Sequence, residues 1–278
     1  MKYCMMTYTC ARQGMKMPEI CQLAQDLGLD AMDQVGLQEW TAAQTRKMAA
    51  DHGLQIICYT FMTQVNHEDD KLRLAGLDAY KRELDVALEL GAPMIMLPLP
   101  GKAQYTRSQS RRNIMKSMPA MAQLARAAGL VLTIENFPGE TSPFTISDDM
   151  EEVIRYIPSV RITFDNGNVL TGGEDPCDGF ARTRQWIVHS HFKDYSLARE
   201  GEKCLIGLDG RKYKPALIGE GLVDYTALLK AMIDAGYAGY VNIEYEGNEY
   251  TASDAMKRAL AHLVSLEESL SAAAGECK

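Results

Sequence analysis

Short apolar runs alternate with longer amphipathic segments along most of the chain. Several runs are apolar almost throughout, as expected for parallel strands covered on both faces. The runs span residues 2–9, 29–34, 54–60, 93–97, 130–135, 160–165, 186–193 and 239–244. The pattern predicts strands at these positions, with helices between them.

The segments between the runs have helical spacing, and most of them end at a glycine. Helices are predicted over residues 18–28, 42–53, 68–91, 108–129, 224–236 and 252–270. A glycine just past the last turn is a common helix stop, and it ends all of these segments except the last. Asp224 is the predicted N-cap of its helix, and Ser253 or Asp254 is the predicted N-cap of the last one.

This alternation favours a (β/α)₈ TIM barrel, which usually takes about 250 residues. A doubly wound open sheet is the alternative, but its first turn is normally rich in glycine, and the turn TCARQGM here is not. No linker or change of composition marks a second domain, so residues 1–278 are expected to form one barrel domain. The longest irregular stretch, about 194–221, is expected to be an active-site loop. Residues 271–278 are expected to form a short C-terminal tail.

The charge balance excludes several classes of partner. The chain has 37 acidic against 29 basic residues and a formal net charge of −8. This balance argues against nucleic acid, which needs a basic face, and against an anionic membrane surface. The seven scattered cysteines lack a C-x-x-C pair, which is typical of a reducing compartment. With neither a signal-peptide pattern nor an apolar run near ~20 residues, a cytoplasmic location is expected.

Polar groups stand at the ends of four successive predicted strands, where barrel enzymes carry their catalytic groups. They are Glu135, Asp165, His191 and Glu244. Each alone has an ordinary explanation as a solvated acid, a turn cap or a hydrogen-bonded interior histidine. Together, the carboxylates would raise one another's pKa unless a cation bound between them. The set therefore predicts a divalent metal site that suits Mn²⁺ best, with Mg²⁺, Co²⁺, Fe²⁺ or Zn²⁺ as alternatives.

The motifs around these residues resemble the xylose-isomerase-like TIM-barrel superfamily, often called the sugar phosphate isomerase/epimerase family. They are TIENFPG (133–139), ITFDNGN (162–168), HSHFKDY (189–195), IGEGLVDY (218–225) and GYAGYVNIEYEG (236–247). The resemblance covers nearly the whole chain.

The resemblance implies one divalent metal, often Mn²⁺, bound by Glu135, Asp165, His191 and Glu244. It also implies that the two glutamates act as an acid–base pair on opposite faces of a carbohydrate substrate. Most relatives in this superfamily are homo-oligomers, and some lyases pair with a small second subunit, so a homo-oligomer is expected.

Two departures from the family pattern argue against a standard ketose 3-epimerase. Asn168 stands where many members have histidine, and asparagine cannot act as a base. Thr141 and the segment HFKDYSL (191–197) stand where ketose 3-epimerases carry a further acid and an arginine. A three-metal endonuclease of the same superfamily needs extra histidine ligands and a DNA-binding face, which five histidines and an acidic chain do not supply.

The leading expectation is therefore a sugar isomerase or epimerase that moves a proton next to the carbonyl of a keto-sugar, with Glu135 and Glu244 as the catalytic pair. The alternative is a lyase or dehydratase in which the same enediolate loses a β-leaving group from an inosose or a 3-keto-glycoside. A third class, a non-enzymatic sugar-binding or partner subunit, is disfavoured by the intact set of four ligands.

Further residues near the strand ends are candidates for supporting roles. Expected substrate contacts are Asn168, His189, Lys193 and His67, and expected hydrogen-bond partners of the metal ligands are Glu220 and Asp194. Structural alternatives stay open for them: an interior histidine for His189, an ion pair for Lys193 and Asp194, a turn residue for Glu220 and an exposed histidine for His67.

Overall fold

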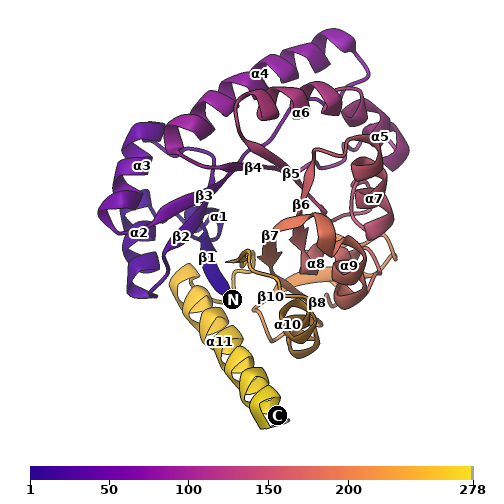
Figure 1. The fold of residues 1–278 in the computed structure, drawn as a ribbon. Helices are drawn as coiled ribbons and strands as arrows, with labels where there is room; N and C mark the ends of the chain where they lie inside the picture. The colour runs from indigo at the N-terminus through magenta and orange to yellow at the C-terminus, as the bar shows by residue number, and fades with distance from the viewer. Residues whose placement is uncertain (277–278) are drawn as a thin grey trace.

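A closed barrel of parallel strands forms the centre of the computed structural model, which describes residues 1–276 (Figure 1). Within that range the barrel strands are β1 (Lys2–Met6), β2 (Ala31–Val35), β3 (Gln55–Thr60), β4 (Met94–Leu97), β5 (Val131–Glu135), β6 (Arg161–Asp165), β7 (Ile187–Phe192) and β11 (Tyr240–Ile243). Their order around the barrel is β1-β11-β7-β6-β5-β4-β3-β2. The predicted (β/α)₈ barrel is confirmed, and every barrel strand lies within its predicted run, apart from one extra residue at the end of β2.

Helices surround the barrel (Figure 1). They are α1 (Thr7–Ala11), α2 (Met17–Asp26), α3 (Ala42–Asp51), α4 (Asp70–Leu90), α5 (Arg107–Met115), α6 (Met118–Ala127), α7 (Ser147–Tyr156), α8 (Asn166–Thr171), α9 (Pro176–Thr183), a 3₁₀ helix (Arg184–Trp186), α10 (Tyr225–Asp234) and α11 (Ala252–Glu276). The prediction of a single helix over residues 108–129 is wrong, because a two-residue turn separates α5 from α6. Pro119 lies in the first turn of α6, where a proline is tolerated, whereas it would disrupt a helix interior.

The predicted glycine stop of α4 and the predicted N-cap of α10 are present, whereas the N-cap of the last helix differs from the prediction. Gly91 ends α4 at φ 77°, a left-handed conformation that glycine adopts without strain. Asp224 is confirmed as the N-cap of α10, since its Oδ1 accepts a hydrogen bond from the N–H of Ala227. The prediction of Ser253 or Asp254 as the N-cap of the last helix is wrong, because α11 begins at Ala252 and includes both residues. The hydroxyl of Thr251, the residue before the helix, accepts the N–H of Asp254 at 3.1 Å.

Two predictions about irregular segments are corrected. Residues 194–221 were expected to be a loop, yet they contain a small antiparallel sheet of β8 (Asp194–Leu197), β9 (Leu205–Ile206) and β10 (Lys212–Ala216). The tail predicted from residue 271 is helical as far as Glu276, because α11 continues through it. Residues 277–278 of that tail lie outside the described range.

The main apolar core contains side chains of both the helices and the barrel strands. Two smaller apolar clusters, Cys4–Ala31–Ile57 and Met6–Cys58–Met96, lie among the strands β1 to β4. Most buried polar residues of the barrel strands lie on β5, β6, β7 and β11, with others, Asp33, Gln34 and Thr60, on β2 and β3. No helix in residues 1–276 has the length and apolar character needed to cross a membrane.

Candidate active site and metal centre

Four side chains converge where β5, β6, β7 and β11 reach the mouth of the barrel. Glu135 and Asp165 are the last residues of β5 and β6, His191 lies near the end of β7, and Glu244 directly follows β11. All four are buried, and each offers a ligand atom within 4.8 Å of those of the others. The structure thus brings together the four residues that the sequence pointed to as metal ligands.

Hydrogen bonds between side chains and backbone groups fix the position of Asp165 within this cluster. The side-chain amide of Asn136 donates to the carbonyl oxygen of Asp165 at 2.7 Å and accepts its N–H at 2.8 Å. One carboxylate oxygen of Asp165, Oδ1, accepts the N–H of Asn168 at 2.7 Å and so caps α8. The other oxygen, Oδ2, remains directed into the cluster.

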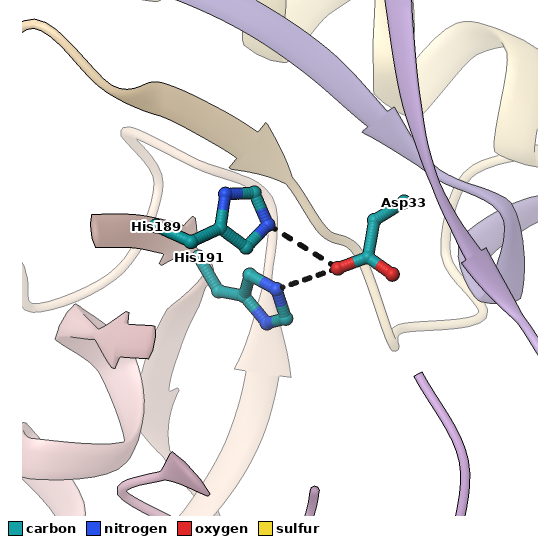
Figure 2. A group of neighbouring side chains, drawn as sticks. All are labelled: Asp33, His189 and His191. Carbon is teal, nitrogen blue, oxygen red and sulfur yellow. Dashed lines mark hydrogen bonds and ion pairs between the residues drawn. The ribbon is translucent and has the colours of Figure 1, made fainter. Parts of the chain in front are cut away.

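A carboxylate outside this cluster, that of Asp33, contacts the imidazole of His191 (Figure 2). Asp33 Oδ2 lies 3.1 Å from Nε2 of His191 and 3.2 Å from Nε2 of His189. The register between β2 and β3 shifts between Met32 and Asp33, and such bulges re-aim side chains. On the other side of the ring, Nδ1 of His191 lies 2.9 Å from Oε1 of Glu135.

The ammonium group of Lys193 lies among the carboxylates. Its Nζ is 2.9 Å from Glu244 Oε2, 3.2 Å from Asp165 Oδ2 and 3.6 Å from Glu246 Oε1. Burial by itself would lower the pKa of Lys193, but the Asp165 and Glu244 carboxylates raise it well above its ordinary value. Lys193 therefore stays charged and compensates part of the negative charge.

Two carboxyl groups of the cluster, those of Asp165 and Glu244, have raised pKa values. Burial raises the pKa of Asp165 to about 7, although the Lys193 ammonium opposes the shift. Burial likewise raises the pKa of Glu244 well above its usual range, again against Lys193. For His191, burial lowers the pKa, but its hydrogen bonds to Asp33 and Glu135 raise it well above the ordinary value.

The donor set fits a divalent cation. Asp165 Oδ2 and Glu244 Oε2 are buried and form ion pairs with Lys193 Nζ, but neither accepts a hydrogen bond of regular geometry from residues 1–276. Buried carboxylate oxygens normally accept hydrogen bonds, so these two still have lone pairs to offer a cation. Three carboxylates and one imidazole are donors that Mn²⁺, Fe²⁺, Co²⁺ and Zn²⁺ all accept. The cluster is therefore a candidate site for one divalent metal ion.

A pocket of about 680 Å³ opens beside the cluster. Glu135, Glu244, Lys193 and Glu246 line its charged side. Its other side is lined mainly by apolar and aromatic side chains of β1 to β4 and of the segments that follow them. The size is suitable for a small organic molecule.

Of the four residues expected to contact the substrate, one lines the pocket and three do not. Lys193 lines the pocket, whereas Asn168 and His189 are buried and do not line it. The side chain of Asn168 accepts a hydrogen bond from the Tyr195 hydroxyl at 3.4 Å. His67 also lies outside the pocket lining, and its Nε2 is 2.9 Å from Nζ of Lys102.

Neither of the residues expected to support the metal ligands contacts them. Glu220 is exposed and accepts hydrogen bonds from the Tyr250 hydroxyl and from Arg258. Asp194 is buried and instead accepts backbone N–H groups, including those of Gly219 at 3.1 Å and Gly221 at 3.0 Å. Its role is to hold the turn that precedes α10.

Sequence reasoning missed Asp33 and Glu246. Asp33 stands inside the otherwise apolar stretch AMDQV of β2, and a buried acid in a barrel strand was a usable signal. Glu246 follows Glu244 by two residues and gave no signal of its own, since an acid in a loop is ordinary.

The fold and this cluster define a TIM-barrel protein with a buried carboxylate–imidazole centre at the barrel mouth. Residues 21–266 match the family described as xylose isomerase-like TIM barrel. Because the match spans most of the chain, the protein belongs to this family.

Curated relatives fall into more than one class of enzyme. The chain is 24% identical over 151 residues to an inosose dehydratase of Lacticaseibacillus casei, covering 52% of this chain and 50% of the relative. It is 22% identical over 257 residues to a fructoselysine 3-epimerase of Escherichia coli O157:H7, covering 85% and 88%. It is 32% identical over 165 residues to a 3'-dehydrocarminate deglycosidase alpha subunit of Microbacterium sp, covering 59% and 41%. The chain thus spans about half the length of several relatives that it matches.

Solved structures share the fold. A structure of the IOLI protein with a bound zinc atom superposes with a TM-score of 0.80 at 15% identity, covering 97% of this chain and 99% of that one. A D-psicose 3-epimerase from Clostridium cellulolyticum H10 superposes with a TM-score of 0.77 at 12% identity, covering 96% and 99%. At these identities the likeness concerns the fold alone.

Proposed function

We propose that this protein is a divalent-metal-dependent sugar isomerase or epimerase that acts on a keto-sugar. The observation that carries the proposal is that Glu135 and Glu244 belong to one buried four-residue centre and both line the pocket. Their strands, β5 and β11, are separated around the barrel by β6 and β7, so the two carboxylates approach the pocket from different sides.

The proposed ion is Mn²⁺, held by Glu135, Asp165, His191 and Glu244. Three oxygen donors and one nitrogen donor suit Mn²⁺ better than a thiolate-preferring metal. When bound, the ion supplies a positive charge that polarises the substrate carbonyl and stabilises the negative charge of the enediolate.

The chain's own groups carry the proton. A carboxylate oxygen of one glutamate takes the proton from the carbon next to the carbonyl, and the other glutamate returns one. Return to the opposite face of the same carbon gives the epimer. Return to the former carbonyl carbon gives the isomer, with the hydroxyl proton of the neighbouring carbon passing to the former carbonyl oxygen. Lys193 Nζ, 2.9 Å from Glu244 Oε2, orients that carboxylate and offers N–H donors to substrate hydroxyls.

A lyase is the second candidate, and the names of the relatives favour it. Both an inosose dehydratase and a deglycosidase subunit are similar to this chain. In this alternative the substrate carries a leaving group β to its carbonyl. The enediolate then expels that group, and a glutamate that has taken the first proton can protonate it as it leaves.

Incubation of the Mn²⁺-loaded protein with keto-sugars and inososes in D₂O distinguishes the two. The proposal predicts recovered substrate or an isomer with deuterium on carbon. An enone or a released aglycone would instead identify the lyase. Absence of both from every substrate tried, with the ion bound, would contradict an enediolate mechanism.

A further inference from the structure

The mouth of the barrel is divided into two chemically different halves. Four charged pocket residues, Glu135, Lys193, Glu244 and Glu246, come from the ends of β5, β7 and β11, and a fifth, Glu83, lies on α4. The strands β1 to β4 follow one another along the other side of the barrel (Figure 1). These strands and the segments after them contribute mainly apolar groups to the pocket. The metal centre therefore occupies one edge of a larger pocket.

The apolar half is built from large side chains. It includes Val35, Leu37, Tyr59, Phe61 and Met62. The rings of Tyr59 and Phe61 are in contact, with centroids 5.2 Å apart. The side chain of Met62 is 53% exposed although it is apolar.

The apolar half also has few groups that could serve a sugar hydroxyl. The Tyr59 hydroxyl donates to Glu83 Oε2 at 2.7 Å, and the Thr60 hydroxyl donates to Asp33 Oδ1 at 2.8 Å. Within residues 1–276 this leaves Glu83 Oε1 and the Tyr8 hydroxyl as the polar side-chain atoms of this half without a hydrogen bond. A hydroxyl placed against Val35, Leu37 or Phe61 would lose water without gaining a partner, which costs free energy. A free keto-sugar, with a hydroxyl on nearly every carbon, therefore matches the charged half but not the apolar half.

We infer that the substrate is a keto-sugar still carrying an apolar, ring-bearing substituent. The sugar faces the metal centre and Lys193, and the substituent lies against Tyr59, Phe61 and Met62. This inference rests on the proposed function and adds the substrate class to it. Removal of an aromatic ring from water against such a wall provides affinity that a methyl group does not.

Two matched pairs of glycosides test the inference. Methyl and phenyl β-D-glucopyranoside lack a ketone and report binding alone, measured by calorimetry with the Mn²⁺-loaded protein. Methyl and phenyl 3-keto-β-D-glucopyranoside report proton chemistry through deuterium uptake in D₂O. We expect the phenyl member to bind about 10-fold or more tightly than the methyl member, from the extra apolar area buried. We expect a similar preference in kcat/KM for deuterium uptake.

A variant of the apolar wall identifies where the ring binds. Met62→Gln keeps the side-chain length, and because Met62 is exposed, the substitution leaves the buried core unchanged. It should reduce the phenyl-to-methyl preference about 3-fold or more, since a polar amide replaces apolar contact area. Leu74→Gln is the matched control, because Leu74 is 51% exposed on α4 and does not line the pocket.

The outcomes separate this inference from the proposed function. Equal affinities for the two glucosides, or a preference unchanged in Met62→Gln, would overturn the apolar subsite. Deuterium uptake with equal rates for the two 3-keto-glycosides would overturn it while leaving the proton chemistry intact. A phenyl preference that Met62→Gln reduces supports the subsite even where deuterium uptake is absent, in which case the proton chemistry alone is overturned.

Discussion

Asp33 Oδ2 and His191 Nε2 lie 3.1 Å apart in the interior of the barrel, and the same oxygen is 3.2 Å from Nε2 of His189. Although burial opposes ionisation of Asp33, its hydrogen bonds with the two histidines hold its pKa below the ordinary range. An ionised carboxylate only accepts hydrogen bonds, so His191 carries a proton on Nε2. Its Nδ1 then faces Glu135 and the candidate metal site, which is the orientation a metal-ligating histidine needs.

Replacement of Asp33 by asparagine tests this orienting contact. We expect Asp33→Asn to raise the Kd for Mn²⁺ about 10- to 100-fold, as found when hydrogen-bond partners of metal ligands are changed. Activity should fall at limiting Mn²⁺ and recover in part at saturating Mn²⁺, which a general loss of structure would not produce. Asp30→Asn, at an exposed position just before β2, is the control and should leave the Kd unchanged.

Lys193 compensates the negative charge of the cluster. Lys193→Met should therefore lower the free energy of unfolding of the metal-free protein by about 3–5 kcal/mol, because it leaves buried carboxylates without their partner. Added Mn²⁺ should stabilise this variant by more than it stabilises the unmodified protein. Urea unfolding with and without Mn²⁺ measures both effects.

The comparison for this substitution is Lys16→Met, which removes an exposed ion pair with Glu39. It should change the free energy of unfolding by less than about 1 kcal/mol. Equal effects of the two substitutions would show that Lys193 does not compensate a buried charge.

The affinity for Mn²⁺ should rise with pH. Burial raises the pKa of Asp165 to about 7 and also raises that of Glu244, so protons compete with the ion below neutral pH. The raised pKa of His191 acts in the same direction, because a protonated Nδ1 cannot ligate. Calorimetry near neutral pH, in buffers of different ionisation enthalpy, should show proton release on binding. An affinity equal at about pH 6 and about pH 8 would contradict these ligands.

Asp194 and Glu220 are expected to differ in their effect on stability. Asp194→Asn removes an acceptor of several backbone N–H groups in the turn before α10 and should cost about 1–3 kcal/mol of unfolding free energy. Glu220→Gln changes only exposed contacts and should cost less than about 1 kcal/mol. Chemical denaturation of the two variants measures the difference.

The strands and the four clustered side chains could be predicted because their signal is local. A barrel strand is a short apolar run, and a terminal acid such as Glu135 or Asp165 contradicts simple packing at that position. Since the carboxyl ends of parallel strands meet at one rim of a barrel, order along the chain was sufficient to bring them together.

What the sequence could not provide depends on long-range geometry. Asp33 meets His191 across the barrel, between residues 158 positions apart in the chain. Asp194 accepts backbone N–H groups of the turn before α10 instead of contacting the metal ligands. This placement likewise depends on how residues 194–221 fold. The small sheet in that segment has short strands, such as the two residues of β9, which carry almost no periodic signal.

In the proposed mechanism, Glu135 and Glu244 both move the proton while they hold the metal. The direct measurement is deuterium uptake from D₂O into a keto-sugar by Glu135→Gln and Glu244→Gln, with the Mn²⁺ content of each variant determined in parallel. We predict that each variant retains bound Mn²⁺ through its amide oxygen and loses about 100-fold or more in the uptake rate. Uptake at the unmodified rate by either variant, with Mn²⁺ still bound, would contradict the two-glutamate mechanism.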